Sequence, residues 1–198
     1  MQSQDVIVAG ADGSAESLAA VAWAATRAER TGTTLQVVCT YALASYAAAA
    51  LDGGYAVLDD NALKEGAQLV VDEAVTHAKK FTTTPVEGIV QAGDPAAVLV
   101  TLSKKAAMVV VGSRGGGGFT DRLLGTVSSA LPAHAHCPVV IVPQHKSGKA
   151  FTPVDRIVVG SDGSDVASSA LKKAVDEALV WEARLTAVCA VPLRKVPA

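Results

Sequence analysis

The segment with the clearest chemical potential is rich in glycine and lies in the second half of the chain. It begins with Gly112-Ser-Arg-Gly115, and nine residues later Gly125 introduces a run that opens a helix. Glycines let backbone N–H groups approach an anion closely, and a helix N-terminus adds amide donors and a favourable dipole. Side-chain donors in the same segment are Arg114, Thr126, Ser128 and Ser129. The pattern favours a phosphate-binding site over a merely flexible connection.

Neither of the two standard phosphate-binding motifs is present. The Gly-Lys pair of a P-loop occurs only at Gly148-Lys149, where no Ser or Thr follows and Pro143 stands in place of the first glycine. A dinucleotide-binding Gly-x-Gly-x-x-Gly that starts at Gly115 fails because Thr120 occupies the last glycine position. The phosphate site must therefore be of another kind.

Asp12 is the acidic residue of a second glycine-containing turn, Gly10-Ala-Asp-Gly-Ser14. An Asp in such a turn commonly forms the turn itself or caps the helix that follows. Alternatively, its carboxylate accepts hydrogen bonds from the hydroxyl groups of a ribose. Its counterpart Asp162 lies in a copy of the turn that no glycine-rich loop accompanies, so we expect Asp162 to bind no ligand.

The other candidates for chemistry carry weaker signals. His134, His136 and Cys137 are of types that bind zinc, but no second cluster follows at zinc-site spacing, which favours a structural role. No Gly-x-Ser-x-Gly elbow marks a nucleophilic serine. The 3 cysteines lie far apart in apolar runs, which is typical of reduced thiols rather than of a disulfide framework.

Alternating strand and helix patterns position these residues. Short apolar runs predict strands, and apolar stripes of helical period bounded by capping residues predict helices. We expect strands at 5–9, 35–40, 86–91, 108–111 and 139–142, and helices after Ser14, over 61–81, after Asp94 and over 125–135. This order predicts an α/β fold with an open five-stranded parallel sheet and helices on both faces. Such sheets bind ligands at the C-terminal ends of their strands, where both glycine-containing turns lie.

The chain repeats its own beginning. Residues Ile7 to Ser14 are echoed by Ile157 to Ser164 at an offset of 150 residues, and the register continues without a gap into the second strand. We expect a complete domain over 1–143, a linker over 144–154 and a partial β-α-β repeat over 155–198. A full copy needs roughly 140 residues, a normal domain size, so the second copy is predicted to be truncated.

Charge and hydropathy exclude two classes of partner. The chain has 17 Lys and Arg against 19 Asp and Glu, a net charge of −2 with no basic run, so nucleic acid is not an expected partner. Two long uncharged stretches, 31–51 and 123–145, are interrupted by threonines and by prolines respectively, so neither predicts a membrane span. We expect a cytoplasmic protein.

The joint pattern resembles the universal stress protein family. The segments Val111-Gly-Ser-Arg-Gly-Gly-Gly-Gly-Phe119 and Leu123-Leu-Gly-Thr-Val-Ser128 meet every position of the family's nucleotide motif, Gly-x2-Gly-x9-Gly-[Ser/Thr], and Asp12 matches its acidic residue. The resemblance covers 5–143 fully and 155–191 in part. It implies the strand order 3-2-1-4-5 and the ATP-binding branch, with ATP, with or without Mg²⁺, as the ligand.

The resemblance also implies which residues hold the nucleotide. Adenine and ribose are expected against Asp12, Thr40 and Val111. The phosphates are expected on the glycine-rich segment, at Gly112, Gly115, Gly125, Thr126 and Val127. The predicted site is completed by neighbours on the same two turns, namely Gly10, Ala11, Arg114 and Ser128.

The function implied is that of a nucleotide-dependent regulatory module in the stress response. Three alternatives stay open: a slow ATP hydrolase, a binder of cyclic AMP or AMP, and a dimerisation scaffold with an empty site. Members of the family commonly pair through the fifth strand, so we expect a homodimer through the apolar edge Val139–Val142.

Overall fold

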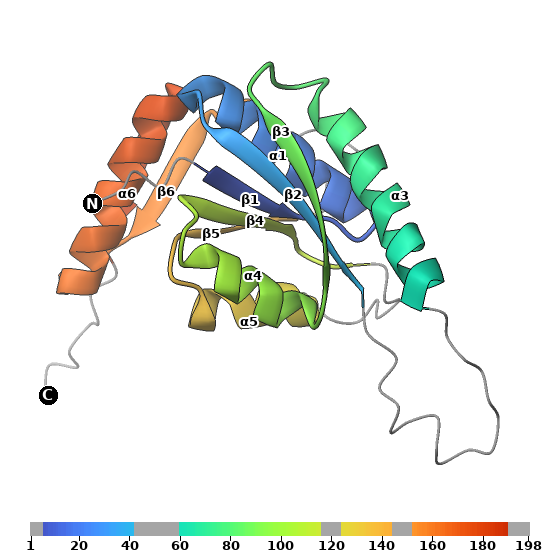
Figure 1. The fold of residues 1–198 in the computed structure, drawn as a ribbon. Helices are drawn as coiled ribbons and strands as arrows, with labels where there is room; N and C mark the ends of the chain where they lie inside the picture. The colour runs from blue at the N-terminus through green and yellow to red at the C-terminus, as the bar shows by residue number, and fades with distance from the viewer. Residues whose placement is uncertain (1–5, 42–59, 116–123, 144–151, 190–198) are drawn as a thin grey trace, which may run out of the picture. The chain divides into compact units, whose positions relative to one another are not determined.

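The computed structural model of the chain describes residues 6–41, 60–115, 124–143 and 152–189 (Figure 1). It divides into two compact units, a first unit Met1–Phe151 and a second unit Thr152–Ala198. The centre of the predicted glycine-rich loop, the predicted linker as far as residue 151 and the last residues of the predicted repeat lie outside the described residues.

Five parallel strands form the sheet of the first unit: β1 (Val6–Gly10), β2 (Thr34–Tyr41), β3 (Val86–Ala92), β4 (Met108–Gly112) and β5 (Val139–Val142). Their order is β3-β2-β1-β4-β5, which confirms the predicted sheet. The chain moves outward from β1 to β3 and then returns to β4 on the other side of β1. The turns that follow β1 and β4 are therefore neighbours at the switch point of the sheet.

Helices cover both faces of this sheet, as predicted. The helices α1 (Ala15–Thr31) and α3 (Asp60–Ala78) lie on one face, and α4 (Pro95–Ser103) and α5 (Thr126–His134) lie on the other (Figure 1). Because each helix connects two parallel strands, the segment after each strand emerges at the same edge of the sheet.

Capping residues read from the sequence set three of the helix ends in the first unit. Ser14 caps α1 by accepting a hydrogen bond from the Ser17 amide at 3.1 Å, and Gly32 ends the helix with φ 65°. Asp94 caps α4 ahead of a proline at the first helical position. The helix expected over 61–81 ends earlier, at Ala78. The Phe81 amide bonds the Ala78 carbonyl three residues back at 2.9 Å, which tightens the chain into a turn.

Small and β-branched side chains build the core. A cluster between the sheet and the helices α4 and α5 consists of Val8, Val38, Val98, Leu99, Ala106, Val109, Val111 and Leu131. On the opposite face, α3 packs so closely on β3 that a methyl group at Gly88 would collide with Val71. This close approach lets small side chains cover a sheet that has few aromatic residues.

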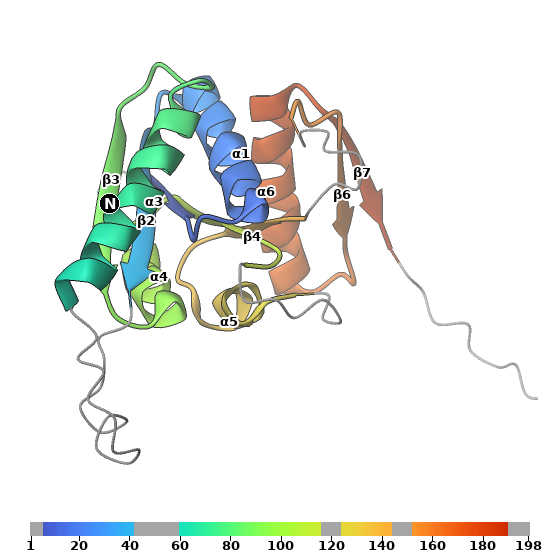
Figure 2. The same ribbon diagram turned by 90° about the vertical axis from the view of Figure 1, so that its right-hand side faces the viewer.

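The second unit is a β-α-β arrangement of β6 (Arg156–Gly160), α6 (Asp165–Trp181) and β7 (Arg184–Val188), with α6 against the parallel strand pair (Figure 2). At the offset of 150 residues, β6 corresponds to β1 and β7 corresponds to the first part of β2. Val8 and Val38 are 1% and 2% exposed beneath α4 and α5, whereas their counterparts Val158 and Val188 are 60% and 50% exposed. The second unit therefore reproduces one covered face of the sheet and leaves the other face open.

Candidate functional site

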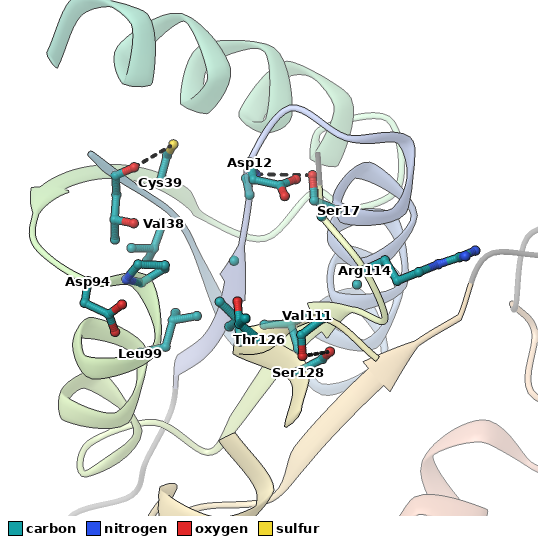
Figure 3. Close-up of a pocket in the computed structure, with 18 of the residues that line it drawn as sticks. Asp12, Ser17, Val38, Cys39, Asp94, Leu99, Val111, Arg114, Thr126 and Ser128 are labelled. Atoms are coloured by element: carbon teal, nitrogen blue, oxygen red, sulfur yellow. Dashed lines mark hydrogen bonds between the residues drawn. The ribbon is translucent and has the colours of Figure 1, made fainter. Parts of the chain in front are cut away.

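A cavity of about 850 Å³ opens at the C-terminal edge of the first unit's sheet (Figure 3). It lies between the turn after β1, the ends of β2 and β4, and the N-termini of α4 and α5. Its lining residues are Gly10, Ala11, Asp12, Ser17, Val38, Cys39, Thr40, Gly93, Asp94, Pro95, Leu99, Val111, Gly112, Arg114, Gly115, Leu124, Gly125, Thr126, Val127 and Ser128. The structure thus brings every predicted site residue to one cavity.

The N-terminus of α5 opens into this cavity without a side-chain cap. Gly125 is the N-cap residue in an extended conformation, and as a glycine it supplies no side-chain cap to the first turn. The first intrahelical bond on this cap runs from the Ser129 amide to the Gly125 carbonyl at 3.0 Å. The amides of Thr126 and Val127 therefore have no intrahelical acceptor, and they face a cavity where an anion would provide one.

The N-terminus of α4 lines the same cavity but is already satisfied. The Asp94 carboxylate accepts the Ala97 amide at 2.9 Å, and Pro95 at the first helical position has no N–H to donate. Asp94 also places a negative charge there. Of the two helix ends, α5 is therefore the one that suits a phosphate.

The hydroxyl groups of α5 divide into two roles. Ser128 is buried and donates to the Ser113 carbonyl at 2.7 Å, which ties the helix to the end of β4. Ser129 donates to the Gly125 carbonyl at 2.6 Å. Both hydroxyl protons thus serve the protein and hold the helix start in place. Thr126 is exposed at the cavity and can turn its hydroxyl toward a ligand.

Two glycines of the predicted motif have a packing reason as well. A methyl group at Gly112 would lie 2.9 Å from the backbone carbonyl carbon of Glu16, so β4 passes directly against the start of α1. A methyl group at Gly115 would collide with the Asp12 carboxylate. The absence of side chains therefore lets the two turns approach each other.

Asp12 forms the turn after β1, which is one of the two roles predicted for it. Its Oδ1 atom accepts the Ser14 amide at 3.0 Å and the Ser14 hydroxyl at 2.5 Å, while Gly13 adopts φ 80°. Its backbone amide donates to the Ser17 hydroxyl at 3.3 Å (Figure 3). The other carboxylate oxygen lies against Gly115 on the facing turn. The carboxylate thus spans the mouth of the cavity between the two turns.

The remaining wall of the cavity is largely apolar. Val38, Leu99 and Val111 belong to the core cluster below it. Burial first, and the negative charge of Asp12 second, raise the pKa of the Cys39 thiol, so this group stays protonated at neutral pH. The Arg114 side chain extends away from the other labelled side chains (Figure 3). One side of the cavity suits a flat apolar group, and the α5 side suits an anion.

Sequence reasoning missed several lining residues, namely Ser17, Val38, Cys39, Gly93, Asp94, Pro95, Leu99 and Leu124. The position of Gly93, Asp94 and Pro95 directly after β3 could have located them, because that strand ends at the same edge. Leu99 points toward the cavity from within α4, and no local pattern marks it.

The structure offers no support for a metal centre or a membrane span in the part that it describes. Within the described ranges, no three His, Cys, Asp or Glu side chains gather closely enough to hold a metal ion. Among the described helices, none combines the length and apolar character needed to cross a bilayer.

Comparison with known proteins identifies the family of this chain. Residues 5–143 match the universal stress protein family. A universal stress protein of Mycobacterium tuberculosis is 37% identical over 183 residues, which cover 87% of this chain and 59% of that protein. The chain thus spans about three fifths of the length of the curated relatives that it matches.

Solved structures share the fold. A universal stress protein from Archaeoglobus fulgidus aligns with 97% of this chain and 69% of its own, with a TM-score of 0.74 and 21% identity. A universal stress protein solved in complex with cAMP aligns with 70% of this chain and 96% of its own, with a TM-score of 0.55 and 27% identity. The match over residues 5–143 covers more than half of the chain and shows that the chain belongs to the universal stress protein family.

Proposed function

We propose that the cavity of the first unit binds an adenine nucleotide and that the protein works as a nucleotide-dependent regulatory module. The observation that carries the proposal is the start of α5, where uncapped amides face a cavity with an apolar opposite wall. A cavity of about 850 Å³ lies within the range of roughly 300–1,000 Å³ that small-molecule sites occupy. The related protein solved with cAMP supports the same ligand class.

The proposed placement follows the chemistry of the walls. The phosphates lie on the amides of Thr126 and Val127, with Gly112, Gly115 and Gly125 allowing the close approach. The base lies on the apolar wall near Thr40 and Val111, and the ribose hydroxyl groups donate to Asp12. The other lining residues predicted from the sequence, Gly10, Ala11, Arg114 and Ser128, shape the turns that hold these groups.

ATP is the nucleotide that we place first, since the glycine motif of the ATP-binding branch is complete in this sequence. A single uncapped helix end also suits one phosphate group, so AMP and cyclic AMP are the competing ligands. Slow hydrolysis of bound ATP is an alternative that we place below binding. Bound nucleotide would stabilise the folded protein by mass action and alter the surface around the cavity mouth.

The assembly that we propose is a homodimer through β5. In the described part of the sheet β5 pairs only with β4, and its four residues are all Val or Ile. An apolar strand edge of this kind favours pairing with another strand. The proposed stress-response role and a cytoplasmic location are carried by membership of the family alone.

Isothermal titration calorimetry of the purified protein tests the proposal. The protein is titrated with ATP, AMP and cyclic AMP, each with and without Mg²⁺, and with GTP as a control for the base. We expect saturable binding of at least one adenine nucleotide and much weaker binding of GTP. The variant Gly115→Asp, which places a second carboxylate against Asp12, is expected to lose this binding while keeping its cooperative thermal transition. No heat of binding with any adenine nucleotide would contradict the proposal and leave the scaffold alternative.

A further inference from the structure

The turn after the first strand occurs twice in this chain with nearly the same geometry. In the first unit the Ala11 amide bonds the Val38 carbonyl at 2.8 Å, and in the second unit the Ser161 amide bonds the Val188 carbonyl at 2.9 Å. Each Asp accepts the amide of the serine two residues later at 3.0 Å. The glycine between them adopts φ 80° in one copy and 84° in the other.

The helix starts agree as closely as the turns do. Ser14 accepts the amide of the third helical residue at 3.1 Å, and Ser164 does the same at 3.1 Å. The second copy is therefore an internal reference for what this turn needs in order to form.

The third helical residue differs between the copies, with Ser17 in the first and Ala167 in the second. Ser17 is 4% exposed, and its hydroxyl accepts the Asp12 amide at 3.3 Å and donates to the Ser14 carbonyl at 2.9 Å. Because the second copy builds the same turn and cap around an alanine, this hydroxyl is not required by the local fold.

Both Asp carboxylates accept hydrogen bonds from the serine two residues later, and they differ in their other surroundings. Hydrogen bonds from the Ser164 hydroxyl and amide, and a smaller one from its own backbone amide, lower the pKa of Asp162. In the first copy the backbone amide of Asp12 is instead engaged by Ser17, and the carboxylate reaches across to Gly115. Ser17 also lines the cavity, whereas Ala167 belongs to a unit without a glycine-rich loop.

We propose that Ser17 is a positioning residue of the nucleotide site, which holds the Asp12 backbone amide and thereby directs the Asp12 carboxylate across the cavity mouth toward the ribose. This assignment rests on the proposed function. A purely structural Ser17 would affect stability alone, whereas a positioning Ser17 affects ligand affinity through Asp12.

The test is a double-mutant cycle measured by calorimetry with the nucleotide that the wild type binds. Ser17→Ala is expected to raise the Kd about fivefold, the effect of one hydrogen bond of ordinary strength. In an Asp12→Asn background the same change is expected to have no further effect on Kd, because Ser17 acts through that carboxylate. The matched control Ala167→Ser, which adds the hydroxyl to the second copy, leaves the Kd unchanged.

The outcomes separate this inference from the proposed function. If the wild type binds nucleotide but Ser17→Ala binds equally well, or loses the same factor in both backgrounds, the positioning role is wrong while the function stands. A wild type that binds no adenine nucleotide overturns the proposed function.

A second measurement needs no ligand. In the free protein the Hα–Hβ NMR couplings of Asp12, which report its side-chain rotamer, are expected to change in Ser17→Ala while those of Asp162 stay constant. Unchanged Asp12 couplings overturn the inference, whatever the calorimetry shows.

Discussion

Adding a side-chain cap to α5 should stabilise the protein and abolish nucleotide binding at the same time. Gly125 has φ −77°, which any residue adopts, and a side chain there would begin 3.5 Å from the Arg114 Cα atom, an ordinary contact. The variant Gly125→Asp therefore fits the backbone. Its carboxylate would accept the amides of the first helical turn, which are the groups that we assign to phosphate.

The substitution is expected to raise the stability of the folded protein and to lower its affinity for nucleotide. Replacing a glycine N-cap by Asp contributes a few tenths of a kcal/mol, and a negative charge at a helix N-terminus adds about 0.3–1 kcal/mol. A gain of about 1 kcal/mol raises the Tm by about 2–4 °C in a protein of this size. Two negative charges about 4 Å apart repel by about 4 kcal/mol at an effective dielectric constant of 20. We therefore expect the Kd to rise at least about a hundredfold, which corresponds to about 2.7 kcal/mol.

Calorimetry and thermal denaturation of three variants measure both effects. Gly125→Asn supplies a cap without a charge and is expected to fall between wild type and Gly125→Asp in affinity. Gly66→Asp adds the same charge at an exposed position on α3, where a side chain meets no atom within 4 Å, and is expected to leave the Kd unchanged. A Gly125→Asp protein that binds nucleotide as tightly as the wild type would refute the assignment of the phosphate to α5.

Four further predictions address other parts of the account. Asp12→Ala is expected to raise the nucleotide Kd about tenfold, a loss of about 1.4 kcal/mol, whereas Asp162→Ala leaves it unchanged in the same titration; equal effects would contradict the difference between the units. Gly112→Ala is expected to lower the free energy of unfolding by about 1–3 kcal/mol in urea denaturation, because its methyl group would lie 2.9 Å from the α1 backbone; an unchanged midpoint would show that the helix yields. The Thr83 amide, then the Thr82 and Thr83 hydroxyls, lower the pKa of Glu29 below 4.5, so its contribution to stability is present above that pH and is lost as pH falls through the lower folded value. The stability difference between wild type and Glu29→Gln in urea should accordingly shrink in acid, and a constant difference would remove Glu29 from the acid response. Size-exclusion chromatography with light scattering at tens of micromolar is expected to give a dimer mass, and a monomer mass would rule out pairing through β5.

The fold was predictable because its signals are local and repeated. Ser14, Gly32, Asp94 and Pro95 each set a helix end through their own side chain or backbone preference, and the structure places them as expected. The order of the strands came from the family resemblance, since the length of a connection alone does not say on which side of β1 the chain returns.

The sequence pointed to the glycines of the cavity, to Asp12 and, through the family resemblance, to Thr40 and Val111, but it did not mark the rest of the apolar wall. The lining residues Leu99 and Cys39 are apolar and are drawn to the cavity by tertiary packing, which no spacing in the sequence reports. The role of Ser128 was also hidden. From the sequence, its hydroxyl could donate a hydrogen bond either to a phosphate or to the protein. In the structure it donates to the Ser113 carbonyl.

Native mass spectrometry of the protein as purified, without added nucleotide, tests the central claim most directly. The small molecule released on denaturation is identified in the same experiment, and the intact mass reports the assembly. We predict an adenine nucleotide at up to one per chain, or its uptake when ATP and Mg²⁺ are added to a preparation that arrives empty. A protein that carries no nucleotide and gains no mass with ATP, AMP or cyclic AMP would contradict the account, because the uncapped start of α5 would then serve the fold alone.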